Sequence, residues 1–138
     1  EGDGLVRLGD FQAEKYSERH QGVDFDPAKM EKLREKPTSC SHIIAIGMHR
    51  DERKSVPEIE EVCAVSCAVQ NMWLTASAHR IGCYWSTGGI TYYEGINDFF
   101  GWGPNDRLLG FLYLGMPATD KWPVGKRSGI DNKVQWVS

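Results

Sequence analysis

The sequence predicts one domain of mixed helices and strands, with helices in the majority. Its 138 residues suit a single domain. Apolar residues recur at helical spacing over residues 57–80, and two short apolar runs, 42–48 and 107–114, are bounded by turn residues, which is typical of strands. Two strands are too few for a stable sheet, so further strands are expected from the C-terminal tail, a preceding segment or a second chain.

The first two expected elements are helices over residues 4–20 and 27–35. The second is predicted to begin at Pro27, because Asp26 is a favoured N-cap residue and proline suits the first helical position. Both helices are expected to bury an apolar stripe, which consists of Leu5, Leu8, Phe11 and Tyr16 in the first and of Met30 and Leu33 in the second.

A buried strand over residues 42–48 (HIIAIGM) is expected to precede the long helix. Ser55 and Glu58 have the spacing of a capping box, which predicts that the long helix begins near residue 57. The helix is expected to run to about residue 80, and Gly82 is the predicted C-cap.

The long helix is apolar on more than one face and rich in small residues, which indicates a central position or a dimer interface. Gln70 and Asn71 lie in its middle, where amides need partners if they are buried. Two interpretations remain open for this pair: a hydrogen bond between helices, or a polar contact to a bound ring.

Residues 83–90 (CYWSTGGI) place two aromatic residues directly before four residues with small side chains. The stretch is expected to connect the long helix with the next one. One interpretation is a turn whose tryptophan, Trp85, joins the core. The other is a loop whose free backbone N–H groups bind a ligand, with Trp85 covering one face of it.

Three elements are expected after this stretch. Thr91 and Glu94 have capping-box spacing, which predicts a helix that ends at Gly101. A second strand over residues 107–114 (RLLGFLYL) follows. Residues 118–138 form an extended tail whose end, residues 133–137, alternates like a strand; such a tail is expected to pack on a partner subunit.

Composition excludes several classes of protein. The net charge of −3 argues against a nucleic-acid partner, and no apolar run approaches the ~18 residues of a membrane span. The four cysteines form no C-x-x-C pair, so no metal site is expected, and they are predicted to be buried free thiols in a reducing cytoplasm. Motifs of nucleophilic or metal catalysis are absent, and the GWG at residues 101–103 is interpreted as a turn.

Several motifs together resemble the C-terminal part of the nitroreductase family of flavoproteins, especially its short bacterial members. They are QNMWL at residues 70–74, RIGCYWSTG at 80–88, FFG at 99–101 and DRLLGFLYLGMP at 106–117. The resemblance covers residues 36–117 well and the tail loosely. The pairing of GFLYLGMP with an upstream G-x-x-W-x-[ST]-G is its most specific part.

The resemblance implies an α+β fold, with a central and mostly antiparallel sheet flanked by helices. Residues 1–138 would form one such domain, with 118–138 as a tail that wraps a partner in an intertwined homodimer. Two FMN molecules would lie at the interface, and the long helix would form the dimer core. The family's opening Arg-Arg-Ser-x-Arg-like segment is not in this sequence, which also lacks an initiator Met. By this comparison, roughly the first third of the family's domain is either absent or not shown.

The resemblance also implies the site residues. The family's flavin loop falls on Trp85, Ser86, Thr87 and Gly88, whose backbone would approach the isoalloxazine ring. The family's late phosphate-binding basic residue matches Arg127, with Lys126 as its neighbour; the planar fork of arginine suits a phosphate. No side-chain catalyst is expected, because the flavin carries the chemistry.

The implied function is that of an FMN-dependent oxidoreductase. It would use NAD(P)H to reduce a small-molecule acceptor such as a nitroaromatic compound or a quinone. Two alternatives share the fold: a flavin-binding module without enzymatic activity, and a flavin-consuming or dehalogenating branch of the family.

Overall fold

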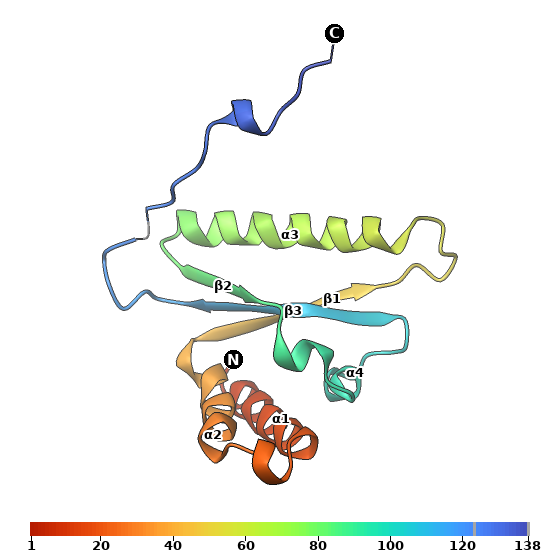
Figure 1. Cartoon of the computed structure of the whole chain (residues 1–138), viewed down its shortest axis with the longest axis vertical. Coiled ribbons are helices and arrows are strands. Elements are labelled where there is room, and N and C mark those ends of the chain that lie inside the picture. Colours follow the sequence, from red (N-terminus) through yellow and green to blue (C-terminus); the bar gives the residue numbers. More distant parts are fainter. Residues whose placement is uncertain (123, 138) are drawn as a thin grey trace.

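The computed structural model describes residues 1–122 and 124–137 and consists of three layers. A three-stranded sheet lies in the middle, the long helix α3 (Glu58–Ala78) crosses one face, and the helices α1, α2 and α4 cover the other (Figure 1). The predicted mixture of helices and a mostly antiparallel sheet is therefore confirmed.

The sheet has the order β1-β3-β2 and is antiparallel throughout. Its strands are β1 (His42–His49), β2 (Gly82–Ser86) and β3 (Asp106–Gly115). Strand β2 comes from the stretch predicted to be a connecting loop, so that prediction was wrong. A five-residue strand is too short for its sequence to show the two-residue alternation of a strand. Strand β2 forms because Cys83 to Trp85 pair with β3.

Two further strand predictions also need correction. Residues 133–137 are not a strand but follow a short 3-10 helix, η4 (Ile130–Asn132), in a tail that leaves the domain beyond α3 (Figure 1). Strand β1 is not fully buried: Ile46 and Met48 are buried, whereas Ile44 is exposed. The reason is its place at the edge of the sheet, where α3 and the other helices cover only part of it.

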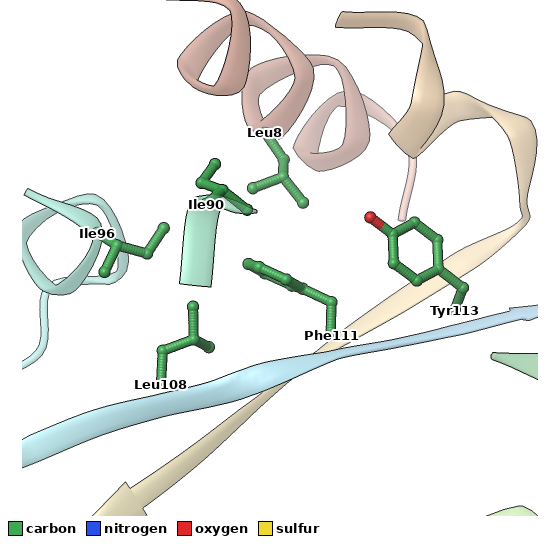
Figure 2. Close-up of a cluster of buried hydrophobic side chains, with 6 residues drawn as sticks. All are labelled: Leu8, Ile90, Ile96, Leu108, Phe111 and Tyr113. Atoms are coloured by element: carbon green, nitrogen blue, oxygen red, sulfur yellow. The ribbon is translucent and has the colours of Figure 1, made fainter. Parts of the chain in front are cut away.

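Side chains alternate between two cores, one on each face of β3. Phe111 and Tyr113 point toward Leu8 of α1 and Ile90 (Figure 2). Leu112, which lies between them, packs on the opposite face with Ile46 and with Val69 of α3. A strand covered by helices on both faces explains the nearly continuous apolar run of its sequence.

The first two helices, α1 (Asp3–Arg19) and α2 (Pro27–Glu35), confirm their predicted bounds within about a residue. The Asp26 carboxylate accepts a hydrogen bond from the Ala28 N–H at 2.9 Å, which is the predicted N-cap. Met30 and Leu33 are only half-buried, contrary to the prediction; α2 lies beside α1 on the same side of the sheet (Figure 1). The turns η1 (Gly22–Asp24) and η2 (Lys36–Ser39) connect these helices to the sheet.

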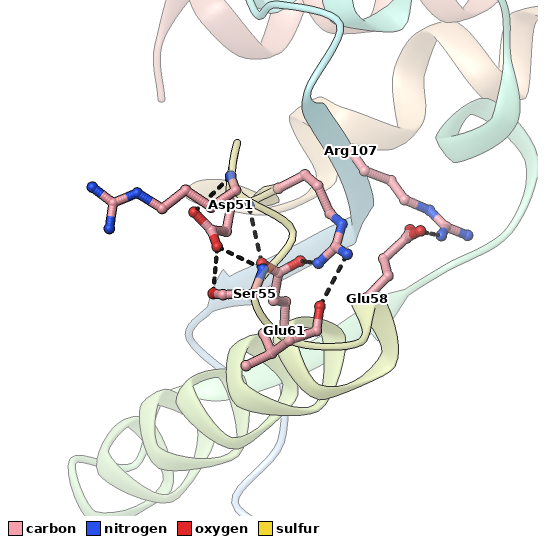
Figure 3. A network of polar contacts seen from close by, with 8 residues as sticks. Asp51, Ser55, Glu58, Glu61 and Arg107 are labelled. Atoms are coloured by element: carbon pink, nitrogen blue, oxygen red, sulfur yellow. Dashed lines mark hydrogen bonds and ion pairs between the residues drawn. The ribbon is translucent and has the colours of Figure 1, made fainter.

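The start of α3 is held by charged groups and not by the predicted capping box. The Ser55 hydroxyl donates to Asp51 at 2.5 Å, and Glu58 pairs with Arg107 of β3 at 2.7 Å (Figure 3). Glu61 accepts from the Asp51 N–H and pairs with Arg50, and these two contacts lower the pKa of its carboxyl group. The intervening Pro57 occupies the N-cap position, so Ser55 lies too far back to cap the helix.

The end of α3 differs from the prediction as well. Arg80 adopts a left-handed conformation, with a φ of 58°, and the Ile81 N–H donates to the Ala76 carbonyl at 2.9 Å. This is the Schellman motif, which glycine usually provides. Gly82 is not the C-cap because it is already the first residue of β2.

The second predicted capping box is also wrong. Thr91 lies in a 3-10 turn, η3 (Gly89–Tyr92), and its hydroxyl donates to the Gly88 carbonyl. The helix that follows, α4 (Ile96–Phe100), is preceded by Gly95 and ends at Gly101 as predicted.

All four cysteines are free, but Cys63 and Cys67 are exposed on α3 and not buried. They share this open face with Ile59 and Leu74, which are 64% and 59% exposed. Among the described residues, no helix has the length and apolar character that a membrane crossing requires.

Candidate functional site

The loop after β2 carries unused backbone donors. Within the described part of the chain, the N–H groups of Thr87 and Gly88 donate to no acceptor. A Cβ atom placed on Gly88 would meet no atom within 4 Å, so the loop faces open space. Free N–H groups in an accessible turn suit an electron-rich ring edge or an oxygen-rich group.

A glycine in β3 fixes the position of this loop. Gly110 has a φ of +135°, and a Cβ there would lie 2.5 Å from the Ser86 carbonyl oxygen and 2.7 Å from Trp85 Nε1. The end of β2 can approach β3 this closely only because position 110 has no side chain. The predicted site did not include Gly110, although a glycine inside an apolar strand is a signal of close approach.

Strand pairing separates the predicted site residues onto two faces. The Trp85 side chain packs on the α3 side with Leu112, and its buried indole N–H has no hydrogen-bond partner among the described residues. Ser86 and Gly88 instead line a cavity of about 260 Å³ on the opposite side, next to Phe111. Successive residues of a strand point to opposite faces, so Trp85 and Ser86 cannot line the same face of a pocket with their side chains.

The predicted phosphate residues lie elsewhere. Lys126 and Arg127 are exposed on the tail, which leaves the domain on the side of α3 (Figure 1). The loop at Thr87 and Gly88 leads to η3 on the other side of the sheet. A single copy of the chain therefore does not bring the two groups of predicted cofactor residues together.

A larger apolar groove of about 660 Å³ lies between the C-terminal half of α3 and the edge of the sheet. Asn71 lines it, together with His79, the C-cap residue of α3, and His42 of β1. Gln70 is exposed, and in the described residues neither amide side chain forms the hydrogen bond between helices that was one of the two interpretations. No cluster of three potential metal ligands occurs in residues 1–122 and 124–137.

The residues present fit the edge of a flavin ring in part. The Thr87 and Gly88 donors and the open space at Gly88 form a cradle that a Cβ would fill. The basic residues for a phosphate are present in the chain but need a second copy, or another placement of the tail, to reach that cradle.

Comparison with known proteins agrees with this fold. The family model described as Nitroreductase family matches residues 4–116. Over 92 residues the chain is 33% identical to YdjA of Escherichia coli strain K12, which is named as a candidate NAD(P)H nitroreductase. The match covers 67% of this chain and 50% of that protein, so the chain spans about half the length of this curated relative.

Solved structures show the same fold. A nitroreductase-like family protein from Bacillus cereus superposes with a TM-score of 0.79 at 27% identity, over 99% of this chain and 69% of that one. A candidate nitroreductase from Desulfovibrio desulfuricans, solved in complex with FMN, has a TM-score of 0.58 at 20% identity, over 97% and 84% of the two chains. The chain belongs to the nitroreductase family.

Proposed function

We propose that this chain is part of an FMN-dependent oxidoreductase that uses NAD(P)H to reduce nitroaromatic compounds, quinones or similar acceptors. The observation that carries the proposal is the pair of N–H groups at Thr87 and Gly88, which have no acceptor among the described residues and lie beside the open space at Gly88. Family membership supports it, as do the FMN complex of the Desulfovibrio desulfuricans relative and the activity in the name of YdjA.

The chemistry that FMN supplies when bound is the transfer of electrons from the nicotinamide to the acceptor. The chain's part in the proposal is binding and orientation. The N–H groups of Thr87 and Gly88 donate to the ring edge, and the backbone of Trp85 and Ser86 holds this loop against β3. Arg127, assisted by Lys126, binds the phosphate through charge-assisted hydrogen bonds.

A homodimer is part of the proposal. The open face of α3 exposes Ile59 and Leu74, and the tail exposes Trp122 and Trp136 (42% and 90%). Large apolar side chains exposed on one helix face and along a tail are typical of surfaces that pack on a partner. In the proposed dimer, the α3 helices pack on each other, and each tail carries Lys126 and Arg127 to the partner.

Gly88→Val tests the flavin loop directly. The position has room for a side chain and an ordinary φ of −97°, so the variant is expected to unfold at the wild-type temperature. The valine would occupy the space through which the ring edge approaches, so the Kd for FMN should rise about tenfold or more. Flavin fluorescence titration measures it, and Gly4→Val, also in open space but in α1, is the matched control. Unchanged FMN affinity would mean that the loop is a simple turn that does not contact FMN.

Removal of residues 118–138 tests the dimer. The full chain is expected to elute with the mass of two chains, and the shortened chain with the mass of one, because the tail's apolar contacts are lost. Light scattering after gel filtration measures both masses. The double change Lys126→Ala and Arg127→Ala separates the two roles of the tail: it should weaken FMN binding and leave the dimer intact. A shortened chain that remains dimeric would contradict the proposed wrapping.

A further inference from the structure

A second feature of the α1 side is the buried amide of Gln12. This residue is only 2% exposed, and its Nε2 atom has no hydrogen-bond partner among the described residues. Its neighbour is the Tyr113 hydroxyl: burial raises the pKa of that hydroxyl and the contact with Gln12 lowers it, but the two groups do not meet the geometry of a full hydrogen bond. Gln12 lines the cavity of about 260 Å³ beside the loop. A buried donor without a partner is costly, so an acceptor atom inside the cavity would satisfy it.

The polar groups that line this cavity favour an anion. Besides Gln12, the lining includes Lys36, Ser86 and Gly88. No Asp or Glu lines it in the described part of the chain. Lys36 Nζ lies 5.3 Å from the centroid of the Tyr113 ring, which keeps the positive charge beside the cavity. Oxygens of a carboxylate would accept from both the amide and the ammonium group.

The rest of the lining favours a flat apolar body. The rings of Phe111 and Tyr113 project from β3 toward Leu8 and Ile90 (Figure 2), and Tyr93 adds a third ring. The volume lies below the ~300–1,000 Å³ of pockets that hold drug-sized ligands. The cavity therefore has room for one ring but not for an entire FMN molecule.

We propose that this cavity binds a single-ring aromatic carboxylate, held by Gln12 and Lys36. The carboxylate accepts from Gln12 Nε2 and pairs with Lys36, and the ring packs against Phe111 and Tyr113. The cavity shares Ser86 and Gly88 with the proposed flavin loop, but the argument depends on Gln12 and its neighbours and is independent of FMN.

A fluorinated benzoate, titrated into the 138-residue chain and followed by fluorine NMR, tests the proposal. Wild type should show saturable binding, and Gln12→Leu should weaken it about tenfold or more. The leucine fills a similar volume and removes an unsatisfied donor, so the thermal midpoint should not fall. Gln21→Leu, a change at an exposed position away from the cavity and from α3, is the matched control and should bind like wild type. If Gln12→Leu fails to fold, Lys36→Met at an exposed position should show the same loss of binding.

Three results would overturn the proposal: no saturable binding by wild type, wild-type binding by a folded Gln12→Leu or Lys36→Met variant, or equal affinity for the fluorinated benzyl alcohol that lacks the charge. Flavin absorbance, recorded on the same samples, distinguishes failure of this proposal from failure of the proposed FMN binding. A chain that binds FMN but no carboxylate contradicts only this inference. A chain that binds the carboxylate but no FMN contradicts only the proposed function.

Discussion

Replacing Gly110 by valine is expected to lower the free energy of unfolding by about 4 kcal/mol, the largest effect of any single change considered for this chain. The φ of +135° is strained for a residue with a side chain, which costs of order 1–3 kcal/mol. The new Cβ would also lie 2.5 Å from the Ser86 carbonyl oxygen, a backbone atom that can move only if β2 moves. Overpacking of this kind typically costs ~1–3 kcal/mol more.

The measurement is urea unfolding, followed by far-UV circular dichroism and tryptophan fluorescence. Gly115→Ala is the matched control, because it lies on the same strand and its Cβ would make an ordinary contact, 3.7 Å from Cys40 Cβ. The control should change the free energy by less than about 1 kcal/mol. Equal stability of the two variants would show that β2 does not approach Gly110 as closely as the structure describes.

The same change would move the candidate site. Trp85 Nε1 lies 2.7 Å from the position of the new Cβ, and Ser86 directly precedes the loop with the free donors. If β2 shifts to relieve both contacts, the loop at Thr87 and Gly88 shifts with it. FMN affinity should therefore fall together with stability in Gly110→Val, whereas in Gly88→Val it falls alone.

Replacing Gly9 by alanine is expected to destabilise the chain by about 2 kcal/mol, although alanine is the better helix former. Helix propensity alone would stabilise α1 by about 1 kcal/mol. Against this, a Cβ at position 9 would lie 2.1 Å from the Arg34 carbonyl oxygen, where the backbones of α1 and α2 meet. Separating the helices or straining the contact should cost about 3 kcal/mol, at the upper end of overpacking effects, so the steric term decides the sign.

Gly4→Ala provides a control of opposite sign in the same helix. A Cβ at position 4 meets nothing within 4 Å, so only the propensity gain, up to about 1 kcal/mol, remains. Thermal unfolding of both variants gives the comparison: the midpoint should rise for Gly4→Ala and fall for Gly9→Ala. Stabilisation by both changes would mean that α1 and α2 are not in contact at Gly9.

Local signals predicted much of the fold. The apolar repeat of α3, the run of β3 and the Asp26-Pro27 start of α2 all appear as expected, because helical period, strand alternation and N-capping act within a few residues. The two capping boxes failed for a different reason. Ser55 and Thr91 have the right spacing, but their hydroxyl groups hydrogen-bond to Asp51 and to the Gly88 carbonyl, which lie in neighbouring turns.

The candidate site was also predicted only in part. The residue types of 86–88 pointed to free backbone donors, and the structure has them at Thr87 and Gly88. The sequence could not show that residues 82–86 pair with β3, and this pairing places the Trp85 side chain on the face away from Ser86. Whether residues 85–88, Lys126 and Arg127 hold FMN stays a prediction.

By itself, the sequence determined the family, most helices and two strands, since these depend on motifs and periodicities carried by neighbouring residues. Only the tertiary structure decided what Gly110, Gly9 and Gln12 do. Gly110 allows the backbone of β2 to approach, and Gly9 allows the backbone of α2 to approach. Gln12 lines a cavity with Lys36, and its Nε2 atom has no partner among the described residues. Each of these features depends on residues that are distant in sequence, so no local sequence pattern predicts it. Only the close packing of those residues in the folded chain determines its effect.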